Sequence, residues 1–331
     1  MVCSGAGSGA QSNDKGVTTY SFRSRKLVRI AVAATPHLAI PTLDWLLQSE
    51  HDLVRVFTTA PKPSGRGARM TRSDVAQWCE EKKVTCIEIS SISDFTSLLE
   101  DLDCVVVIAF GMLLPQNLLD IPQYGFINLH FSALPRWRGA APVQRAIENG
   151  DAHLGATVFS LDAGMDTGPI YRTELFERDP EMRSSEALDF LAGQGVALIA
   201  TTLKDIESSV APTVQNVDGA STARKLSKDE ALINWNETAR VIQQKVLAFY
   251  PNPIARTIFR GDILKITRAR AAVDSNYQLV PGEVASTKSS LFIGTSDGSL
   301  EILSVIPQGK SEMGASDWAR GMRVEPGERC G

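Results

Sequence analysis

Short apolar runs alternate with helical patterns along the first two-thirds of the chain. Residues 28–34 are almost all apolar and rich in β-branched side chains, a pattern typical of a strand that is buried on both faces. Residues 38–49 carry leucines at helical spacing, and residues 52–58 form a second strand-like run. A strand, a helix and a strand in this order predict a βαβ unit, in which the strands are parallel and the crossover is right-handed.

The alternation continues as far as residue 207. Further strands are expected at residues 85–89, 103–109, 125–130, 156–162 and 169–175. Further helices are expected at residues 74–83, 93–100, 142–149 and 184–207. The pattern predicts an α/β fold in which residues 27–207 form an open sheet, whose ligands bind outside the carboxyl ends of the strands. No GxGxxG motif follows the first strand, so the sequence does not support dinucleotide binding.

The last third of the chain has a different pattern. Residues 208–225 are dominated by small and polar residues and predict a linker. After it, one helix is expected at residues 237–249, and short strands are expected at residues 255–259, 263–268, 282–285, 291–295 and 300–305. Short strands joined by tight turns indicate a small β-barrel, so residues 226–331 are expected to form a second domain.

The composition is that of an ordinary globular protein. Hydrophobic residues make up 43% and charged residues 22% of the chain, and the net charge is −4. No apolar run is long enough to span a bilayer, so no membrane partner is expected. The five cysteines form no CxxC pair, which favours reduced thiols in a cytosol-like compartment. With four histidines and no HxxxH or HExxH pattern, no metal centre is expected.

Residues 1–26 are expected to form a flexible leader. They are rich in Ser and Gly and lack the hydrophobic centre of a secretory signal. They are also poor in Arg and have no apolar helix face, so the mitochondrial matrix is less favoured than the cytoplasm. We expect the chain to act as a monomer.

Two segments are locally basic although the whole chain is slightly acidic. The loop expected at residues 59–72 contains no acid, and its cations are Lys62, Arg66, Arg69 and Arg72. Residues 240–270 contain seven Lys and Arg residues, with Asp262 as the one acid among them. Cations without counter-charges suit contacts with phosphate groups, so both segments are candidates for nucleic-acid binding. The alternative is that both are solvated surfaces whose charge is uneven by chance.

A candidate catalytic group lies in the middle of the chain. Asn128 and His130 are two residues apart on an expected strand and therefore share a face. Asp166 follows in a turn between Gly164 and Gly168, where its carboxylate could reach the imidazole. An amide, an imidazole and a carboxylate that converge where strands end predict an active site. Taken singly, each has a structural alternative, because a lone His is often a packing residue and Asp often forms turns.

The types of these residues point to acyl transfer. No GxSxG elbow or paired cysteine supplies a nucleophile, so the attacking group is expected to arrive with the substrate. In the predicted reaction, Asn128 and a protonated His130 donate hydrogen bonds to the oxyanion that forms when an amine attacks a carbonyl. Asp166 favours the charged imidazole and relays the proton that the amine loses. One such oxyanion donor typically lowers the barrier by about 3 kcal/mol.

The motifs around these residues resemble a known family. Asn128-x-His130, Ser132-x-Leu134-Pro135, the run at 136–144 and Asp166-Thr167-Gly168 are similar to those of the formyltransferases that use 10-formyltetrahydrofolate. Within that family, the resemblance is closest to members that formylate the methionyl group carried by initiator tRNA. The segments that carry this narrower resemblance are residues 61–67, 225–235 and 307–310. The similarity extends from residue 27 to about residue 325.

The resemblance implies a Rossmann-like catalytic domain followed by an OB-like barrel that binds tRNA, with a role in translation initiation. It implies 10-formyltetrahydrofolate as the formyl donor and initiator methionyl-tRNA as the partner, without a metal. It implies that Asn128, His130 and Asp166 are catalytic. The residues expected to bind folate are Phe110, Gly111, Ser132, Ala133, Leu134 and Pro135, and those expected to contact tRNA are Lys62, Arg66 and Arg69.

Two other functions remain open at this point. A folate-dependent formyltransferase that acts on a nucleotide-sugar amine would share the Asn-His-Asp group and the Leu-Pro loop, but it would not need two basic segments. A tRNA-binding protein with an inactive catalytic domain is disfavoured, because all three catalytic residue types are present.

Overall fold

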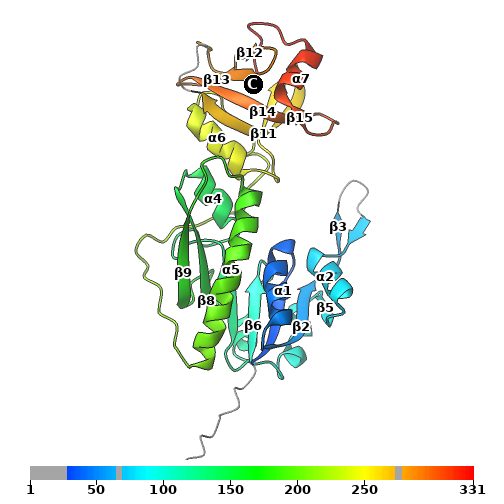
Figure 1. Ribbon diagram of the computed structural model, residues 1–331, viewed down its shortest axis with the longest axis vertical. Coiled ribbons are helices and arrows are strands. Elements are labelled where there is room, and N and C mark those ends of the chain that lie inside the picture. Colours follow the sequence, from blue (N-terminus) through cyan, green and yellow to red (C-terminus); the bar gives the residue numbers. More distant parts are fainter. Residues whose placement is uncertain (1–27, 65–68, 273–277) are drawn as a thin grey trace, which may run out of the picture.

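The computed structural model describes residues 28–64, 69–272 and 278–331, and these residues form two units. In Figure 1 the larger α/β unit lies below and a smaller, mostly β unit lies above it. The expected leader lies outside the described residues. No helix in the described parts of the chain is both long and apolar enough to cross a membrane.

The larger unit is built on a sheet of seven strands in the order β5-β2-β1-β6-β7-β8-β9. The strands are β1 (Arg29–Ala34), β2 (Asp52–Thr59), β5 (Cys86–Ile89), β6 (Cys104–Ile108), β7 (Phe126–His130), β8 (His153–Ser160) and β9 (Ile170–Glu177). Neighbours from β5 to β7 are parallel, whereas β8 is antiparallel to both β7 and β9. The predicted βαβ unit and open α/β sheet are confirmed. The carboxyl ends of the parallel strands therefore share one edge of the sheet.

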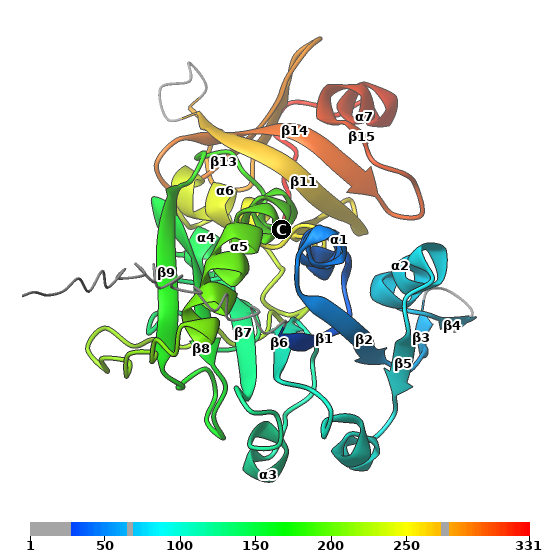
Figure 2. The same ribbon diagram turned by 60° about the horizontal axis from the view of Figure 1, so that its bottom comes forward.

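Helices cover both faces of this sheet. They are α1 (Ile40–Gln48), α2 (Asp74–Lys82), α3 (Gln116–Leu119), α4 (Pro142–Glu148) and α5 (Ser184–Glu207), with 3-10 turns η1 (His37–Ala39), η2 (Ile92–Asp94) and η3 (Thr96–Leu98). Figure 2 shows α1 and α5 on one side of the strands and α3 on the other. Along β1, Ile30 and Val32 belong to the core under α1 and α5, while Ala31 and Ala33 belong to the core on the opposite face. A strand covered on both faces has no polar face, which explains its continuous apolar run.

The position of α5 decides which way the side chains of β7 point. Ile127 and Leu129 belong to the core shared with α5, and a Cβ on Gly195 of α5 would collide with the Leu129 side chain. Successive residues of a strand point to opposite faces, so Asn128 and His130 point away from α5. Close packing on one face of β7 thus fixes the direction of the two candidate catalytic side chains on the other.

Some expected elements differ in the structure. The segment expected as a helix at 93–100 forms two 3-10 turns, η2 and η3. Phe95 and Leu99 are its two fully buried side chains, and short segments of this kind often form 3-10 turns in place of an α-helix. The loop expected at 59–72 contains a hairpin of β3 (Lys62–Ser64) and β4 (Arg69–Thr71), which are paired antiparallel. The hairpin stands out from the edge of the larger unit beside α2 (Figure 1).

The smaller unit contains an antiparallel sheet in the order β10-β11-β14-β13-β12, with β15 paired to β14. Its elements are α6 (Ala239–Ala248), β10 (Arg256–Phe259), β11 (Asp262–Ala272), β12 (Val284–Ser286), β13 (Leu291–Gly294), β14 (Ser299–Pro307), β15 (Met313–Gly314) and α7 (Ala315–Met322). The five expected strands correspond to β10–β14, while α7 was not predicted. The predicted small OB-like barrel is confirmed in outline as an antiparallel half-barrel.

The last residues of the chain connect the two edges of this sheet. The amide of Gly331 donates to the carbonyl of Ile258 in β10 (3.0 Å), and the amide of Val284 in β12 donates to the carbonyl of Glu328 (2.8 Å). Edge strands expose unpaired backbone groups, and this segment satisfies some of them on both edges. The half-barrel is thereby closed by residues that showed no strand pattern in the sequence.

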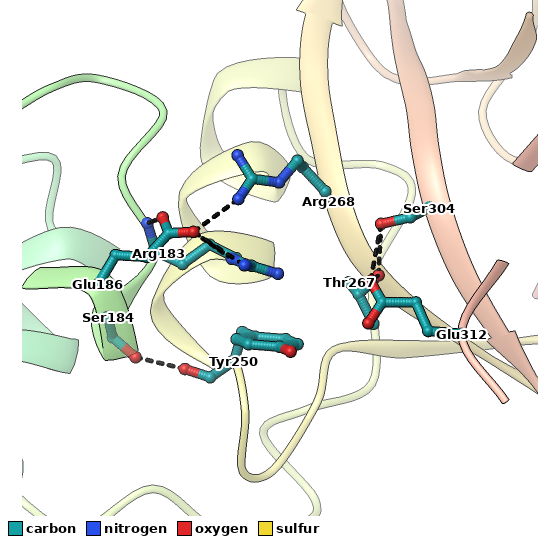
Figure 3. Close-up of polar contacts among 8 residues, drawn as sticks. All are labelled: Arg183, Ser184, Glu186, Tyr250, Thr267, Arg268, Ser304 and Glu312. Carbon is teal, nitrogen blue, oxygen red and sulfur yellow. Dashed lines mark hydrogen bonds and ion pairs between the residues drawn. The ribbon is translucent and has the colours of Figure 1, made fainter. Parts of the chain in front are cut away.

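Polar contacts join the two units at the start of α5 (Figure 3). Glu186 of α5 accepts hydrogen bonds from Arg183 (2.8 Å) and from Arg268 of β11 (2.7 Å). The Arg183 guanidinium lies 4.0 Å from the centre of the Tyr250 ring, and the Ser184 hydroxyl donates to the Tyr250 carbonyl. These contacts hold β11 and the end of α6 against the larger unit.

A second polar cluster lies on the barrel side of this interface (Figure 3). Thr267 of β11 and Ser304 of β14 both contact the Glu312 carboxylate, at 2.6 and 3.0 Å. The cluster ties the turn before β15 to the two central strands. The part of the barrel that faces α5 is therefore internally fixed.

We expect Ser184→Ala to reduce the free energy of unfolding by about 1–2 kcal/mol, because it removes the hydroxyl that donates to the Tyr250 carbonyl. Ser184 is only 1% exposed. Urea denaturation measures the change. The matched control is Ser208→Ala, at the exposed far end of the same helix, which should change stability by less than about 0.5 kcal/mol. Equal effects of the two substitutions would contradict a stabilising contact at Tyr250.

Candidate active site

Asn128 lies in the middle of β7 and is half-buried. Among the described residues, no hydrogen bond to its side-chain amide is found. Its two N–H groups are therefore available to a ligand. Its neighbours in register are Val107 of β6 and Phe159 of β8, so apolar residues flank it on both neighbouring strands.

His130 ends the same strand and is 7% exposed. Its Nε2 lies 3.0 Å from the backbone oxygen of Trp137, and its Nδ1 lies 3.7 Å from Oδ2 of Asp166. A carbonyl oxygen only accepts, so Nε2 carries a proton and donates it to Trp137. In the neutral ring the lone pair is then on Nδ1, on the side of Asp166.

The protonation state of His130 follows from its burial. Burial lowers the pKa of the imidazole below its ordinary value of 6.5, and the Asp166 carboxylate and the Trp137 carbonyl raise it by less. The Phe159 ring packs edge-on against it, with 6.3 Å between ring centres. The imidazole of the free site is therefore neutral at pH 7. The sequence predicted a protonated His130 that donates to the oxyanion during the reaction. In the free site, burial favours the neutral ring instead, and the sequence does not show how completely the ring is enclosed.

Asp166 follows a strand that ends well away from His130. Because β8 is antiparallel to β7, its last residue, Ser160, lies beside Ile127, three positions before His130. That separation is about 10 Å along the strand. The turn at 161–169 doubles back over this distance, with Asp166 in the left-handed region at φ +53°. Its Oδ2 accepts a hydrogen bond from the amide of Gly139 at 2.7 Å.

Two glycines make this turn and its neighbour possible. A Cβ on Gly168 would collide with the carbonyl of Ser160, so the chain can leave β8 this closely only without a side chain. Gly139 has φ +125°, and a Cβ there would lie 2.7 Å from the carbonyl of Ala223. The amide that holds the Asp166 carboxylate therefore depends on a glycine.

The expected folate segment, Ser132 to Pro135, is fixed by internal hydrogen bonds. The Ser132 hydroxyl donates to the carbonyl of Arg136 (2.7 Å), and the Ser132 carbonyl accepts from Thr157 (2.7 Å). Ser132 and Leu134 are buried, whereas Ala133 and Pro135 are half-exposed. A ligand would therefore meet Ala133, Pro135 and the backbone of a rigid loop.

The other expected folate residues lie where β6 ends. Phe110 is 2% exposed, and its carbonyl accepts from the Thr35 hydroxyl (3.0 Å) just after β1. Gly111 is exposed at φ +80°, with open space where a Cβ would lie. The strand order reverses between β1 and β6, which is the position where open α/β sheets bind ligands.

The segment expected to be a linker lies against the loop that follows β7, residues 131–141, which is called the catalytic loop below. The backbone of Arg138 bonds to the carbonyl of Ser221 (2.9 Å) and to the amide of Ala223 (2.7 Å). The hydroxyl of Ser221 also accepts from the amide of Trp137 (3.0 Å). These contacts could not be predicted from the sequence, because small polar residues without periodicity look the same whether they are packed or free.

A cavity of about 300 Å³ lies behind the catalytic loop. Its lining includes Phe131, Ser132, Ala133, Trp137, His153 and Gly155. Asn128, His130 and Asp166 are absent from its lining, so it is separate from the catalytic group. In residues 28–64, 69–272 and 278–331, no group of three or more His, Cys, Asp or Glu side chains could hold a metal ion.

The basic hairpin is only partly described. Lys62 is exposed on β3, the backbone of Arg69 lies in β4, and Arg66 falls outside the described residues. Arg72 forms ion pairs with Glu80 of α2 and Glu88 of β5, both at 2.7 Å. The expectation that no acid opposes these cations was wrong for Arg72, because its partners are distant in the sequence.

The basic strip on the barrel is also smaller than the sequence indicated. Three of its arginines form ion pairs with glutamates outside the segment; the pairs are Arg260 with Glu328, Arg268 with Glu186 and Arg270 with Glu301. Among the described residues, no ion pair is found for Arg240, Lys245, Arg256 or Lys265. The positive charge available to a nucleic acid is therefore concentrated on these four side chains.

Comparison with known proteins gives consistent matches along both units. The chain matches the formyl transferase family over residues 28–203 and the C-terminal domain of formyl transferases over residues 225–323. It is 38% identical to the methionyl-tRNA formyltransferase of Streptomyces griseus over 310 residues, which cover 92% of this chain and 100% of that protein. It is 40% identical to the methionyl-tRNA formyltransferase of Thermobifida fusca over 309 residues, which cover 92% of this chain and 99% of that protein.

Solved structures share the fold at low sequence identity. The N-formyltransferase from Helicobacter canadensis, in complex with folinic acid and dTDP-3-aminofucose, matches with a TM-score of 0.64 at 17% identity, over 83% of this chain and 98% of that one. HypX from Aquifex aeolicus, in complex with tetrahydrofolic acid, matches with a TM-score of 0.66 at 16% identity over 92% of this chain. This chain spans about half of HypX, since the match covers 49% of that protein. With both of its units matched and 38–40% identity over 92% of its length, the chain belongs to the formyl transferase family and, within it, to the methionyl-tRNA formyltransferases.

Proposed function

We propose that this protein transfers the formyl group of 10-formyltetrahydrofolate to the amino group of methionyl initiator tRNA, for translation initiation. The observation that carries the proposal is the convergence of Asn128, His130 and Asp166. An amide with no protein partner among the described residues lies two positions from a buried imidazole, whose Nδ1 faces a carboxylate at 3.7 Å. The relatives at 38–40% identity support the choice of substrate.

The first step is the attack of the neutral methionyl amine on the formyl carbon, which forms the new C–N bond. Charge builds on the formyl oxygen, and the N–H groups of Asn128 are suited to donate to it. The neutral His130 accepts the proton that the amine loses, at Nδ1. The resulting imidazolium is stabilised by Asp166 on one side and by the Trp137 carbonyl on the other. This assigns His130 as a base in the first step, in place of the proton donor that the sequence predicted.

The second step returns the proton. The imidazolium gives it to N10 of the folate as the bond between N10 and the formyl carbon breaks, so tetrahydrofolate leaves neutral and His130 is restored. The buried site favours this return, because desolvation disfavours the charged imidazole. No net proton is lost over the cycle, and no metal is required.

We propose that the folate lies along the carboxyl ends of β1, β6 and β7, with Phe110 and Gly111 on one side and the Ser132–Pro135 loop on the other. Gly111 allows close approach to the backbone, and Ala133 and Pro135 offer apolar surface. Ser132 and Leu134 act by holding the loop, because their own polar groups are bonded internally.

We propose that residues 27–207 form the catalytic domain and residues 226–331 a tRNA-binding domain, joined by residues 208–225, with residues 1–26 as a leader and the monomer as the working form. Lys62, Arg66 and Arg69 of the hairpin would contact the acceptor end. The unpaired cations of the barrel would contact the backbone farther along. A cytoplasmic location would bring the protein together with initiator tRNA.

The direct test of the function is a pair of reactions with 10-formyltetrahydrofolate. One contains methionyl initiator tRNA, and the other contains a nucleotide-sugar amine. We expect formyl transfer to the tRNA-bound methionine alone. Transfer to the sugar alone would overturn the proposal in favour of a sugar formyltransferase.

Asn128→Ala should lower kcat by about 10²–10³-fold, because it removes the donor for the developing oxyanion. Binding of methionyl initiator tRNA should be unchanged, since no hydrogen bond of the Asn128 side chain to the rest of the protein is found among the described residues. Steady-state kinetics and a tRNA binding assay measure the two effects. Wild-type turnover in Asn128→Ala would rule out the assigned role.

The ring of His130 should titrate below pH 6.5 in the free protein, and Asp166→Asn should lower its pKa further. The reason is that the Asp166 carboxylate favours the imidazolium. Between pH 6.5 and the lower pKa of the folded state, the unfolded chain binds the proton and the folded chain does not. The free energy of unfolding should therefore decrease as the pH falls from 6.5 toward the folded pKa, and this decrease should level off below it. NMR of labelled histidine rings measures the titration.

The control for this titration is His153→Gln, which removes an exposed histidine of β8 and should leave the His130 curve unchanged. A higher pKa of His130 in Asp166→Asn would show that the carboxylate does not act on the ring.

Arg66→Ala should weaken the reaction with tRNA and reduce the dependence of binding on salt, because one phosphate contact is lost. The expected change is a higher KM for tRNA with an unchanged KM for the folate. The matched control is Arg29→Ala at the opposite end of the sheet, which makes the same change in net charge. If both variants bind tRNA alike over a range of salt, the hairpin does not contact the acceptor end.

A further inference from the structure

Gln215, inside the segment that the sequence indicated as a linker, has a buried side chain with every hydrogen-bonding group engaged. It is 8% exposed. Its Nε2 donates to the carbonyls of Asp166 (3.0 Å) and Gly168 (2.7 Å). Its Oε1 accepts from Nη2 of Arg138 at 2.6 Å. The Gln215 side-chain amide thus joins the turn at 161–169 to the catalytic loop.

The turn that Gln215 holds includes a residue with an unfavourable backbone conformation. Asp166 adopts φ +53°, a conformation that residues with a Cβ seldom take unless their surroundings impose it. The two carbonyls bound by Gln215 lie on either side of Thr167, so the amide spans the second half of the turn. Next to it, Thr213 and Ile170 exchange two backbone hydrogen bonds at 2.7 and 2.8 Å, which fix the segment to the start of β9.

The Oε1 atom of Gln215 helps to position the backbone amide that donates to the Asp166 carboxylate. Arg138 is bound by Gln215, and the next residue, Gly139, gives its amide to Oδ2 of Asp166 at 2.7 Å. The Nε of Arg138 is buried and has no hydrogen-bond partner in the described part of the chain, so Gln215 is a main anchor of this guanidinium. The backbone of Asp166 and the group that holds its side chain are therefore set by the same residue.

We infer that Gln215 is a positioning residue for the reaction: its side-chain amide holds the Asp166 carboxylate in line with Nδ1 of His130. This inference rests on the proposed function, in which that carboxylate stabilises the imidazolium. Gln215 acts through Asp166 and Gly139 and is too buried to line the substrate site. The role needs two donors and one acceptor in one short group, which an amide supplies and an ionised carboxylate does not.

The test compares Gln215→Ala and Gln215→Glu with Asn216→Ala. Asn216 is the exposed neighbour. Its amide bonds to Asp218, and among the described residues no hydrogen bond joins it to the active site. Both Gln215 variants should lower kcat by about 10²-fold, the size expected from a small displacement of a catalytic group. KM for tRNA and for folate should stay within about 3-fold of the wild-type values, because the loss is confined to the transition state. Asn216→Ala should match the wild type.

A measurement that does not need turnover separates this inference from the proposed function. In NMR titrations, the pKa of His130 in Gln215→Ala should move in the same direction as in Asp166→Asn, and Asn216→Ala should leave it in place. If the wild type transfers no formyl group to tRNA but the His130 titration still shifts, the proposed function fails and the positioning role stands.

The fold of each variant is checked by thermal unfolding. Gln215→Glu keeps the acceptor for Arg138 and the shape of the side chain, so it remains informative if Gln215→Ala does not fold. A kcat of Gln215→Glu equal to that of the wild type, or a His130 titration that is the same in Gln215→Glu and Asn216→Ala, would overturn the inference.

Discussion

The contact between the Asp166 carboxylate and the His130 ring joins two parts of the chain that strand geometry keeps apart. His130 is at the carboxyl end of a parallel strand, whereas Asp166 follows an antiparallel strand that ends beside Ile127. A turn with a left-handed Asp166 and a glycine pressed against the carbonyl of Ser160 closes this distance. Residues 213–223 support this turn through hydrogen bonds, and they lead into the barrel. The constraint at one catalytic contact thus explains why the segment between the two units is packed against the site.

Burial and charge act on His130 in opposite directions, and their balance sets its chemistry. Desolvation favours the neutral ring, and Asp166 limits the cost of the charged ring when it forms. A base must accept a proton and release it within one cycle, so neither effect alone would serve: an exposed ring would exchange protons with water, and a buried ring without Asp166 would be too weak a base. The Trp137 carbonyl adds direction, because it occupies Nε2 and, in the proposed function, leaves Nδ1 as the reactive atom.

The features that the sequence predicted correctly depend on patterns among residues close together in the chain. The spacing of Asn128 and His130 in an apolar run gave the strand and the shared face, and the alternation of apolar runs gave the open sheet. What it missed depends on contacts between residues far apart in the chain. The counter-ions of Arg72 and Arg268, the packing of Gln215 and the closure of the barrel by residues 328–331 all involve partners that no local pattern identifies. The enclosure of the His130 ring belongs to this group, since burial is a property of the folded chain.

The catalytic group alone does not select the amine that receives the formyl group. The N-formyltransferase from Helicobacter canadensis, solved with a nucleotide sugar, matches 83% of this chain, so the arrangement of sheet and following unit is compatible with quite different acceptors. The distinction must then come from surfaces that the shared fold leaves free to vary. In the proposed function, these surfaces are the hairpin that carries Lys62 and the barrel cations that have no ion pair among the described residues, such as Lys265. Because several neighbouring arginines are neutralised by glutamates, the remaining positive charge is confined to a limited area. A confined charge fixes where a phosphate backbone can lie more narrowly than an evenly basic surface would.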